Sequence, residues 1–516
     1  MAVKPYQYEP LADFSLSENR RAMEEALREV RSQFGLSYPL VIGSERIDTG
    51  HKITSFNPST PEQVIGSVSK AETAHIDMAL KTAWGAFAVW KKVSGSKRAR
   101  YLYKAAAIMR RRKLLLSAIE VYEAGKPWAE AVADVAEAID FLEYYGRQME
   151  RLSQKIPLVP LEGEDDRAFY VPLGVGAIIP PWNFPLAILT GMTSAAIVSG
   201  NCVILKPSSS TPVIAAHLVD IFREAGLPPG VLNFVPGDGG SIGDYIVTHP
   251  LTRFISFTGS REVGLRINQL AAQASPGQKW IKRVVVEMGG KDAILVDETA
   301  DLDAAAEGIV ASAFGFQGQK CSACSRAIIV DDVYDLLLSK IVEQAKKLRV
   351  GPADNGNNNL GPVIDDRAYD KILGYIAWGN ENAKLKLGGA PLEGDGYFIP
   401  PTIFSDVAPG SKLEQEEIFG PVLAVIRARD WSDALTIAND TEYGLTGSVY
   451  SAMRERIEQA VDDFEVGNLY VNRKCTGAIV GAHPFGGFNM SGTDSKTGSP
   501  DYLLLFMQMK AVAERL

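Results

Sequence analysis

The sequence predicts an α/β protein with parallel sheets, and two observations carry that prediction. From about residue 170 onward, short β-rich runs that end at or near Pro or Gly alternate with helical stretches. A second alternating region runs from about residue 282 to about residue 475. This alternation is typical of parallel strands with helices on both faces of the sheet. The chain has 516 residues, a length that suggests two or three domains.

The N-terminal part is predicted to be helical. Residues 15–35 (SLSENRRAMEEALREVRSQFG) are expected to start at a Ser cap and to end at Gly35. Residues 71–92 and 126–150 carry apolar residues at the i, i+3 and i+4 spacing of amphipathic helices.

Four short runs give the strands of the first alternating region, and helical stretches separate them. The predicted strands are VGAIIP, NCVILKP, VLNFVPG and FISFTGS, and the helices are TSAAIVSG, PVIAAHLVDIFREAG and GSIGDYIVTH. The second region begins with KRVVVEMGGKDAILV and continues with AIIVDD, KLKLGG, VLAVIRA, GSVYS and GNLYVN. The tail, residues 501–516, alternates weakly and is expected to be a strand added to another element.

Residues 168–205 contain no formal charge, so a hydropathy scan would mark a membrane span there. Pro172 and the run PPWNFP at 180–185 interrupt any continuous apolar helix. We therefore expect a buried strand, a loop and a core helix. The opening MAVKPYQYEP shows no signal-peptide pattern.

Charge and cysteine usage exclude several classes of protein. The net charge of −9 argues against a nucleic-acid or anionic-membrane surface as a partner. The chain has four cysteines and five histidines, and they lack the paired spacing of a zinc site, so no metal is predicted. Four cysteines in a chain of this length fit a reducing cytoplasm.

Two strand ends are candidates for binding a phosphate or a dinucleotide. No GxGxxG pattern follows a strand, although the glycines from Gly237 to Gly243 come close to one. In FISFTGSREVG a strand ends just before Ser260 and a helix follows, whose first backbone amides can hold a pyrophosphate. Lys206 stands where a strand leaves the sheet, the edge at which α/β folds bind ligands.

The segment GFQGQKCSACSR, residues 315–326, contains a candidate nucleophile. Lys320 places a positive charge next to Cys321, and residues after it could open a helix whose amides favour a thiolate. From these residues alone, catalysis and simple burial of Cys321 remain equal alternatives. Cys324 is expected to pack one turn further on the same helix, and Cys202 and Cys475 are expected in the core or in loops.

Six motifs spread along nearly the whole chain decide between these alternatives. GQKCSACSR, VVVEMGGKDA, PPWNFP, FTGSREVG, EEIFGPV and HPFGGFNMSG together resemble the aldehyde dehydrogenase superfamily. Within it, GFQGQKCSACSR, NLYVNRKCTGAIVGAHPFGGFNMSGTDSKTG and the N-terminal helices are most similar to the group of 1-pyrroline-5-carboxylate dehydrogenases. The resemblance implies a Rossmann-type NAD-binding domain, an α/β catalytic domain and a small β oligomerisation flap.

The resemblance also implies the catalytic residues. Cys321 is expected to attack the aldehyde carbon, and the amide of Asn183 to hold the resulting oxyanion. Glu287 is expected to activate the water that hydrolyses the thioester. A CoA-acylating relative would lack this base, and a non-enzymatic relative would be expected to lose the nucleophile or the base, so the presence of both residues argues against these alternatives.

The cofactor residues that the resemblance implies line strand ends and loops. They are Ile179, Pro181, Trp182, Lys206, Ser209, Gly239, Ser260, Val263, Glu417 and Phe419. Ser209 stands where many members have a Glu that pairs with the ribose 2′-hydroxyl and repels a 2′-phosphate. The expected cofactor is therefore NAD, with NADP possible.

The substrate residues that the resemblance implies would recognise a short aldehyde that ends in a carboxylate. The loop of Gly477 and Ala478 is expected to bind that carboxylate through backbone N–H groups, and Ser322 through its hydroxyl. Phe485 is expected to pack on the aliphatic chain, and Glu137 to bound the tunnel. The implied reaction is the oxidation of L-glutamate 5-semialdehyde to L-glutamate in proline degradation. The alternative is an NAD(P)-dependent dehydrogenase of another small carboxylate-bearing semialdehyde.

The resemblance divides the chain into three parts. Residues 1–153 and 172–286 are expected to form the NAD-binding domain with its helical extension, and residues 287–490 the catalytic domain. Residues 154–171 and 491–516 are expected to form the flap, which implies a homodimer or a multiple of dimers. A small-molecule substrate is expected, and neither nucleic acid nor membrane as a partner.

Overall fold

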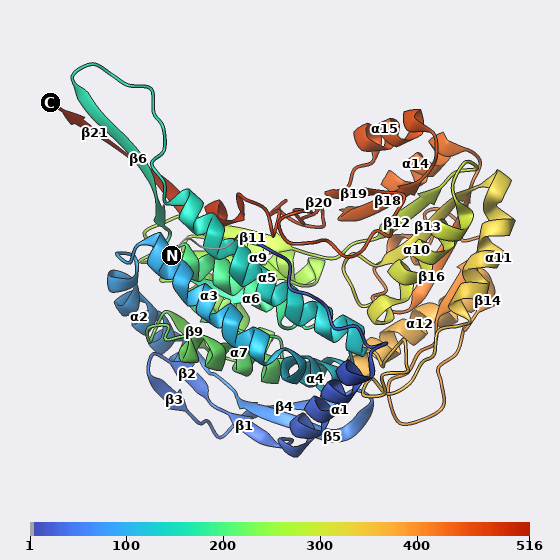
Figure 1. Ribbon diagram of the computed structural model, residues 1–516, viewed down its shortest axis with the longest axis horizontal. Helices are drawn as coiled ribbons and strands as arrows, with labels where there is room; N and C mark the ends of the chain where they lie inside the picture. Colours follow the sequence, from blue (N-terminus) through green and yellow to red (C-terminus); the bar gives the residue numbers. More distant parts are fainter. Residues whose placement is uncertain (1–4) are drawn as a thin grey trace.

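The computed structural model of the chain describes residues 5–516 (Figure 1). Residues 1–4 lie outside the described residues. They belong to the predicted first domain and to the opening segment in which no signal-peptide pattern was found. Two seven-stranded sheets form the centres of two bodies, and a long two-stranded ribbon extends away from them (Figure 1). The prediction of an α/β architecture with parallel sheets is confirmed.

The first sheet has the strand order β11-β10-β7-β8-β9-β2-β3. Its parallel strands are β7 (Val175–Ile179), β8 (Cys202–Leu205), β9 (Leu232–Phe234), β10 (Phe254–Thr258) and β11 (Arg283–Glu287). The antiparallel edge consists of β2 (Leu40–Ile42) and β3 (Glu45–Ile47). The sequence pattern placed the run at 283–287 with the second region; this was wrong, because β11 pairs with β10 over its full length.

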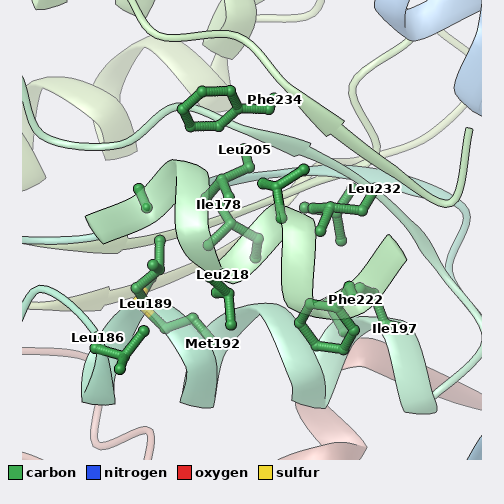
Figure 2. Packing of buried hydrophobic residues seen from close by; sticks show 14 of the residues in the cluster. Ile178, Leu186, Leu189, Met192, Ile197, Leu205, Leu218, Phe222, Leu232 and Phe234 are labelled. Carbon is green, nitrogen blue, oxygen red and sulfur yellow. The ribbon is translucent and has the colours of Figure 1, made fainter. Parts of the chain in front are cut away.

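Helices cover both faces of this sheet, as the alternation predicted. They are α2 (Thr73–Trp90), α6 (Ala187–Val198), α7 (Pro212–Glu224), α8 (Asp244–Thr248) and α9 (Arg261–Ala272). Figure 2 shows side chains of α6 and α7, such as Met192 and Phe222, packed together with strand residues such as Ile178 and Leu205. The charge-free segment 168–205 therefore contains strand β7, the PPWNFP loop and the core helix α6.

Four further helices lie along one side of the first body (Figure 1). They are α1 (Ser17–Ser32), α3 (Gly95–Arg111), α4 (Lys113–Ala124) and α5 (Trp128–Leu152). The expected Ser cap of the first helix was wrong, because Leu16 occupies the cap position and no side chain caps the helix. A separate three-stranded sheet, β1-β5-β4, consists of β1 (Leu36–Tyr38), β4 (Lys52–Asn57) and β5 (Thr60–Ser69).

The second sheet has the order β14-β15-β16-β13-β12-β18-β19. Its strands are β12 (Asp292–Val296), β13 (Cys324–Val330), β14 (Lys384–Leu387), β15 (Thr402–Ser405), β16 (Val422–Ala428), β18 (Thr446–Tyr450) and β19 (Asn468–Val471). All are parallel except the edge strand β14. The covering helices are α10 (Leu302–Phe314), α11 (Tyr334–Ala345), α12 (Asp366–Asn382), α14 (Trp431–Asn439) and α15 (Arg454–Asp463).

The ribbon that extends from the first body pairs β6 (Glu164–Pro172) with β21 (Met507–Arg515), two strands far apart in the chain, in antiparallel register (Figure 1). This confirms that the tail is a strand added to another element. Residues 491–506 precede β21 and contact the first body and the loop after β11. Within residues 5–516, no helix has both the length and the apolar content needed to cross a bilayer.

Candidate active site

A cleft of about 870 Å³ lies at the carboxyl ends of the strands of the first sheet. Along this sheet, β8 and β9 follow β7 in one direction, while β10 and β11 lie in the other. The chain order therefore reverses between β7 and β10. Ligands of open α/β sheets bind in the crevice at such a switch point.

All ten predicted cofactor residues line this cleft. Two catalytic candidates, Asn183 and Cys321, line it as well. We call the part formed by the loops after β7, β8 and β10 the cofactor wall. It consists of Ile179–Asn183, Lys206, Ser208–Ser210 and Thr258–Ser260.

Lys206 is a buried ammonium group on the cofactor wall. Lys206 is 6% exposed, although it follows the end of a strand at the sheet edge. Burial lowers the pKa of Lys206 to about 8, against a small opposing effect of Asp238. Its Nζ makes a long 3.4 Å hydrogen bond to the adjacent Pro207 carbonyl, which leaves donor capacity for a bound hydroxyl or phosphate.

The start of α9 supplies the backbone donors expected for an anion. Ser260 caps this helix, and its Oγ accepts a 3.4 Å hydrogen bond from the N–H of Val263. Gly239 is the first residue of a short helical turn, Gly239–Gly243, which also lines the cleft.

The opposite wall of the cleft contains Glu417 and Phe419. The Phe419 ring meets the Trp182 ring of the cofactor wall edge to face, with 5.6 Å between ring centroids. The Oε1 of Glu417 accepts a 3.2 Å hydrogen bond from the N–H of Gly290, in the loop after β11. Burial raises the pKa of Glu417 despite this bond.

Sequence reasoning missed a group of lining residues at the start of α12. This group consists of Ile364, Asp365, Ala368 and Lys371. The Nζ of Lys371 donates a 3.0 Å hydrogen bond to the Glu417 carbonyl, which connects α12 to the opposite wall. No motif marks these residues, because a helix start that becomes a cleft wall only through tertiary packing has no distinctive composition.

Residues 315–323, which we call the nucleophile loop, carry Cys321. The expected helix after Cys321 was wrong, because Cys324 begins strand β13, and Cys321 lies in a turn. Before it, Phe316 and Gln317 adopt left-handed backbone conformations, with φ of 50° and 58°. Such conformations are strained for non-glycine residues and persist only where the surroundings fix them.

Side-chain amides fix this loop in place. The Nε2 of Gln317 donates hydrogen bonds to the carbonyls of Gly125, at 3.0 Å, and Pro362, at 2.7 Å. The Oε1 of Gln319 accepts a 3.0 Å hydrogen bond from the N–H of Ile364. Two distant segments of the chain, around Gly125 and at Pro362–Ile364, therefore hold the nucleophile loop.

The surroundings of Cys321 favour the protonated form of its thiol. Burial and the nearby carboxyls of Asp292, Glu417 and Glu287 raise its pKa. The expected activation by Lys320 was wrong, because its Nζ forms a 2.8 Å ion pair with Glu130 on α5. A base or a bound ligand has to favour the thiolate.

Asn183 lies directly against the nucleophile loop. Its side chain is buried, and its Nδ2 donates a 3.0 Å hydrogen bond to the carbonyl of Gln319, two residues before Cys321. The PPWNFP loop after β7 and the nucleophile loop are thus joined at the site.

Glu287, the last residue of β11, is buried but does not line the cleft. Its Oε1 accepts a 2.6 Å hydrogen bond from the Ser495 hydroxyl, and its Oε2 a 3.3 Å bond from the N–H of Gly487. Burial raises the pKa of Glu287 to about 7, against the opposing effect of these bonds. A carboxyl with this pKa exchanges a proton near neutral pH.

The five predicted substrate residues do not line the cofactor cleft. Ser322 is buried, and its carbonyl lies 3.5 Å from the Cys475 thiol, so the loop that carries Gly477 lies against the nucleophile loop. Gly477 has a φ of +78°, which favours glycine at this position. The carbonyl of Gly477 accepts a 3.2 Å hydrogen bond from Arg473, a contact that the sequence did not reveal.

The remaining predicted substrate residues are Ala478, Phe485 and Glu137. Ala478 and Phe485 are half-buried, and the N–H of Phe485 donates a 2.8 Å hydrogen bond to the Thr497 carbonyl. Glu137 lies on α5, and burial raises its pKa to about 8.

The other cysteines are packed in the interior, as expected. Cys324, Cys475 and Cys202 are at most 1% exposed. Within residues 5–516, no three His, Cys, Asp or Glu side chains gather in a way that would hold a metal ion. Cys324 is therefore a buried neighbour of the nucleophile candidate.

Comparisons with known proteins agree with this geometry. A 1-pyrroline-5-carboxylate dehydrogenase of Geobacillus sp. (strain WCH70) is 57% identical over 512 residues, 99% of each chain, and one of Bacillus cytotoxicus is 58% identical over 515 residues, 100% of each. A crystal structure of 1-pyrroline-5-carboxylate dehydrogenase from Thermus with bound NAD has a TM-score of 0.99 and 55% identity, and covers 100% of both chains. The model described as "Aldehyde dehydrogenase family" matches residues 46–512, and the chain belongs to this family.

Proposed function

We propose that the protein oxidises L-glutamate 5-semialdehyde, formed by ring opening of 1-pyrroline-5-carboxylate, to L-glutamate with NAD, as a step of proline degradation. The observation that carries this proposal is the junction of three parts at Cys321. The cofactor cleft, the Asn183 loop and the Gly477 loop all meet the nucleophile loop. The full-length similarity to 1-pyrroline-5-carboxylate dehydrogenases supports the choice of substrate.

The residues of the cleft fit a dinucleotide. Lys206 offers a buried ammonium for the adenosine ribose, and the N-terminal amides of α9 offer donors for a pyrophosphate. Glu417 offers carboxylate oxygens for the nicotinamide ribose. When bound, NAD accepts the hydride that the substrate carbon loses. Ser209, a neutral hydroxyl on the cofactor wall, would also tolerate the 2′-phosphate of NADP.

Each catalytic residue then has a separate task. The Cys321 thiol loses its proton to solvent in the cleft that it lines, and the thiolate sulfur adds to the aldehyde carbon. A carbon–sulfur bond forms, the carbonyl π bond breaks, and the carbonyl oxygen becomes an oxyanion. The Asn183 amide has two N–H donors, and we assign the one not bonded to Gln319 to this oxyanion. Loss of a hydride from this carbon would re-form the carbonyl group and convert the thiohemiacetal into a thioester. Glu287 takes a proton from water, the hydroxide attacks the thioester carbon, and the Cys321 thiolate leaves.

The Gly477 loop suits the carboxylate at the other end of the substrate. Backbone N–H groups of Gly477 and Ala478 are accessible because both side chains are small. Arg473 holds this loop through the carbonyls of Thr476 and Gly477. A simple aliphatic aldehyde would leave these donors unpaired, at a cost of about 1–3 kcal/mol for each buried group.

A substrate panel with both cofactors tests the proposal. Glutamate semialdehyde should show the highest kcat/KM, succinate semialdehyde a lower one and propanal the lowest. Ala478→Val should raise KM for glutamate semialdehyde by crowding its carboxylate and should affect propanal much less. Equal damage to both substrates would show that residue 478 supports the loop and does not recognise the carboxylate.

We also propose that two copies of the chain associate through the β6-β21 ribbon, and that the protein is cytoplasmic. The ribbon has two strands in the described part of the chain, so an outer edge can accept a further strand. Phe169 and Met509 on it are 42% and 55% exposed. Sedimentation velocity of the full chain distinguishes a monomer from a dimer or a multiple of dimers. The buried free thiols of Cys202, Cys324 and Cys475 suit a reducing compartment.

A further inference from the structure

Lys126 is a buried ammonium group behind the proposed catalytic residues, in the turn between α4 and α5. Its Nζ forms an ion pair with Asp134 on α5 and lies 3.8 Å from Oε2 of Glu120 on α4. The side chains of all three residues are 0% exposed. A buried ion pair is weak as a source of stability, because desolvation of the charges offsets their attraction. Its presence here therefore calls for another function.

The ammonium of Lys126 contacts aromatic rings from both catalytic loops. Its Nζ lies 4.4 Å from the ring centroid of Phe184 and 4.7 Å from that of Phe316. Phe184 follows Asn183 directly, and Phe316 is the first of the two left-handed residues of the nucleophile loop. Cation–π contacts of this kind are strongest when they are desolvated. One side chain thus contacts a ring from each of the two loops.

Hydrogen bonds complete the connection on both sides. The Oδ1 of Asp134 accepts a 2.6 Å bond from the N–H of Ala187, the first residue of α6, four positions after Asn183. On the other side, Gln317 donates to the carbonyl of Gly125, the residue before Lys126. The Asn183–Gln319 bond then closes a ring of contacts around the site.

Geometry identifies Asp134 as the partner of Lys126, because the two form the close ion pair while Glu120 lies 3.8 Å away. Burial by itself would lower the pKa of Lys126, but Asp134 and Glu120 raise it. Burial raises the pKa of Asp134, against the opposing effect of Lys126. Burial and the neighbouring Asp134 raise the pKa of Glu120 well above its usual range.

We propose that Lys126, paired with Asp134, is a positioning residue that sets the Asn183 amide at its working distance from Cys321. This inference rests on the proposed roles of Asn183 and Cys321. A misplacement of about 1 Å between reacting groups costs about 100-fold in rate. A purely structural ion pair, in contrast, could be replaced by apolar or neutral groups without loss of rate.

The test compares Lys126→Met with Arg98→Met, a matched loss of a buried cation. Arg98 on α3 donates a 2.6 Å hydrogen bond to the carbonyl of Val198, at the far end of α6 from Ala187. Stopped-flow measurement of the first turnover of NADH formation should show a rate reduced about 10- to 100-fold for Lys126→Met. Its KM for NAD should stay near the wild-type value, and Arg98→Met should lower Tm without slowing the first turnover. Equal first-turnover rates for the two variants, measured at a temperature below the Tm of each, would overturn the inference.

A second variant covers the case in which Lys126→Met does not fold. Lys126→Met/Asp134→Asn leaves no unpaired charge at this pair and keeps an acceptor for the Ala187 N–H. It should fold and still show a slow first turnover, whereas a wild-type rate would overturn the inference.

A measurement that needs no substrate separates this inference from the proposed function. The rate at which iodoacetamide alkylates Cys321, followed by peptide mass spectrometry, reports on the loop without any aldehyde. It should change severalfold in Lys126→Met/Asp134→Asn and not in Arg98→Met; an unchanged rate would count against positioning. If wild-type enzyme oxidises none of the semialdehydes, the proposed function fails while the alkylation result still decides this inference.

Discussion

The cofactor wall and the nucleophile loop meet at one cleft but are built in different ways. The cofactor wall consists of loops that follow β7, β8 and β10, so a repeated strand–loop–helix order places its residues together. The nucleophile loop has two strained residues and is held by bonds to Gly125, Pro362 and Ile364. We therefore expect substitutions on the cofactor wall to change binding gradually. Substitutions in the nucleophile loop should have larger effects, because each single contact is needed to hold its conformation.

The largest effect is expected at the centre of the nucleophile loop. Cys321→Ala removes the sulfur that forms the bond to the aldehyde, so the oxidation rate should fall by more than about 1,000-fold. Intact-protein mass spectrometry should detect no acyl adduct. The control is Cys324→Ser, buried at the start of β13, which should keep most activity. A Cys321→Ala enzyme with wild-type rate would exclude this residue as the nucleophile.

The second-largest effect is expected for Glu287, which contacts with residues 487–495 hold outside the cleft lining. Glu287→Gln should slow thioester hydrolysis by about 100- to 10,000-fold and let acyl-enzyme accumulate. In the wild type the carboxylate is the active form and its pKa is about 7, so hydrolysis should fall as pH drops through 7. Quenched-flow mass spectrometry at pH 6 and pH 8 measures the acylated fraction. A pH-independent fraction would assign the base role to another group.

A smaller, graded effect is expected on the cofactor wall. Ser209→Glu introduces a carboxylate that can accept a ribose 2′-hydroxyl bond and repels a 2′-phosphate. The NAD-to-NADP ratio of kcat/KM should rise by about 5- to 150-fold, equivalent to about 1–3 kcal/mol. Ser208→Glu, one position earlier in the same loop, is the matched control. An unchanged ratio in Ser209→Glu would show that the 2′ position does not face residue 209.

The smallest effect is expected from the residue that holds Glu287. Ser495 donates to Oε1 of Glu287 and thereby lowers the pKa of this carboxyl. Ser495→Ala should therefore move the pH midpoint of thioester hydrolysis upward by about one unit and reduce the rate at pH 7 severalfold. Ser499→Ala, a nearby buried serine that accepts from the Asp501 N–H, should leave the midpoint in place. A downward shift in Ser495→Ala would contradict the assigned direction.

The sequence by itself determined the order of elements and the residues of the cofactor wall. Strand ends such as Ile179, Lys206 and Thr258 are close in space because parallel strands place their carboxyl ends at one edge. All ten cofactor residues that the motifs implied therefore line the cleft, although the division into domains at residue 286 and the roles of the site residues remain proposals.

Tertiary structure alone decided how the nucleophile is held. The sequence predicted a helix after Cys321 and activation by Lys320, but Cys324 enters β13 and Lys320 is paired with Glu130. A local pattern cannot show which distant group satisfies a charge or stabilises a left-handed residue, since these partners lie on other segments. Lys126 is the clearest case. Nothing in its neighbourhood along the chain marks it, and only the fold places its ammonium between Phe184 and Phe316.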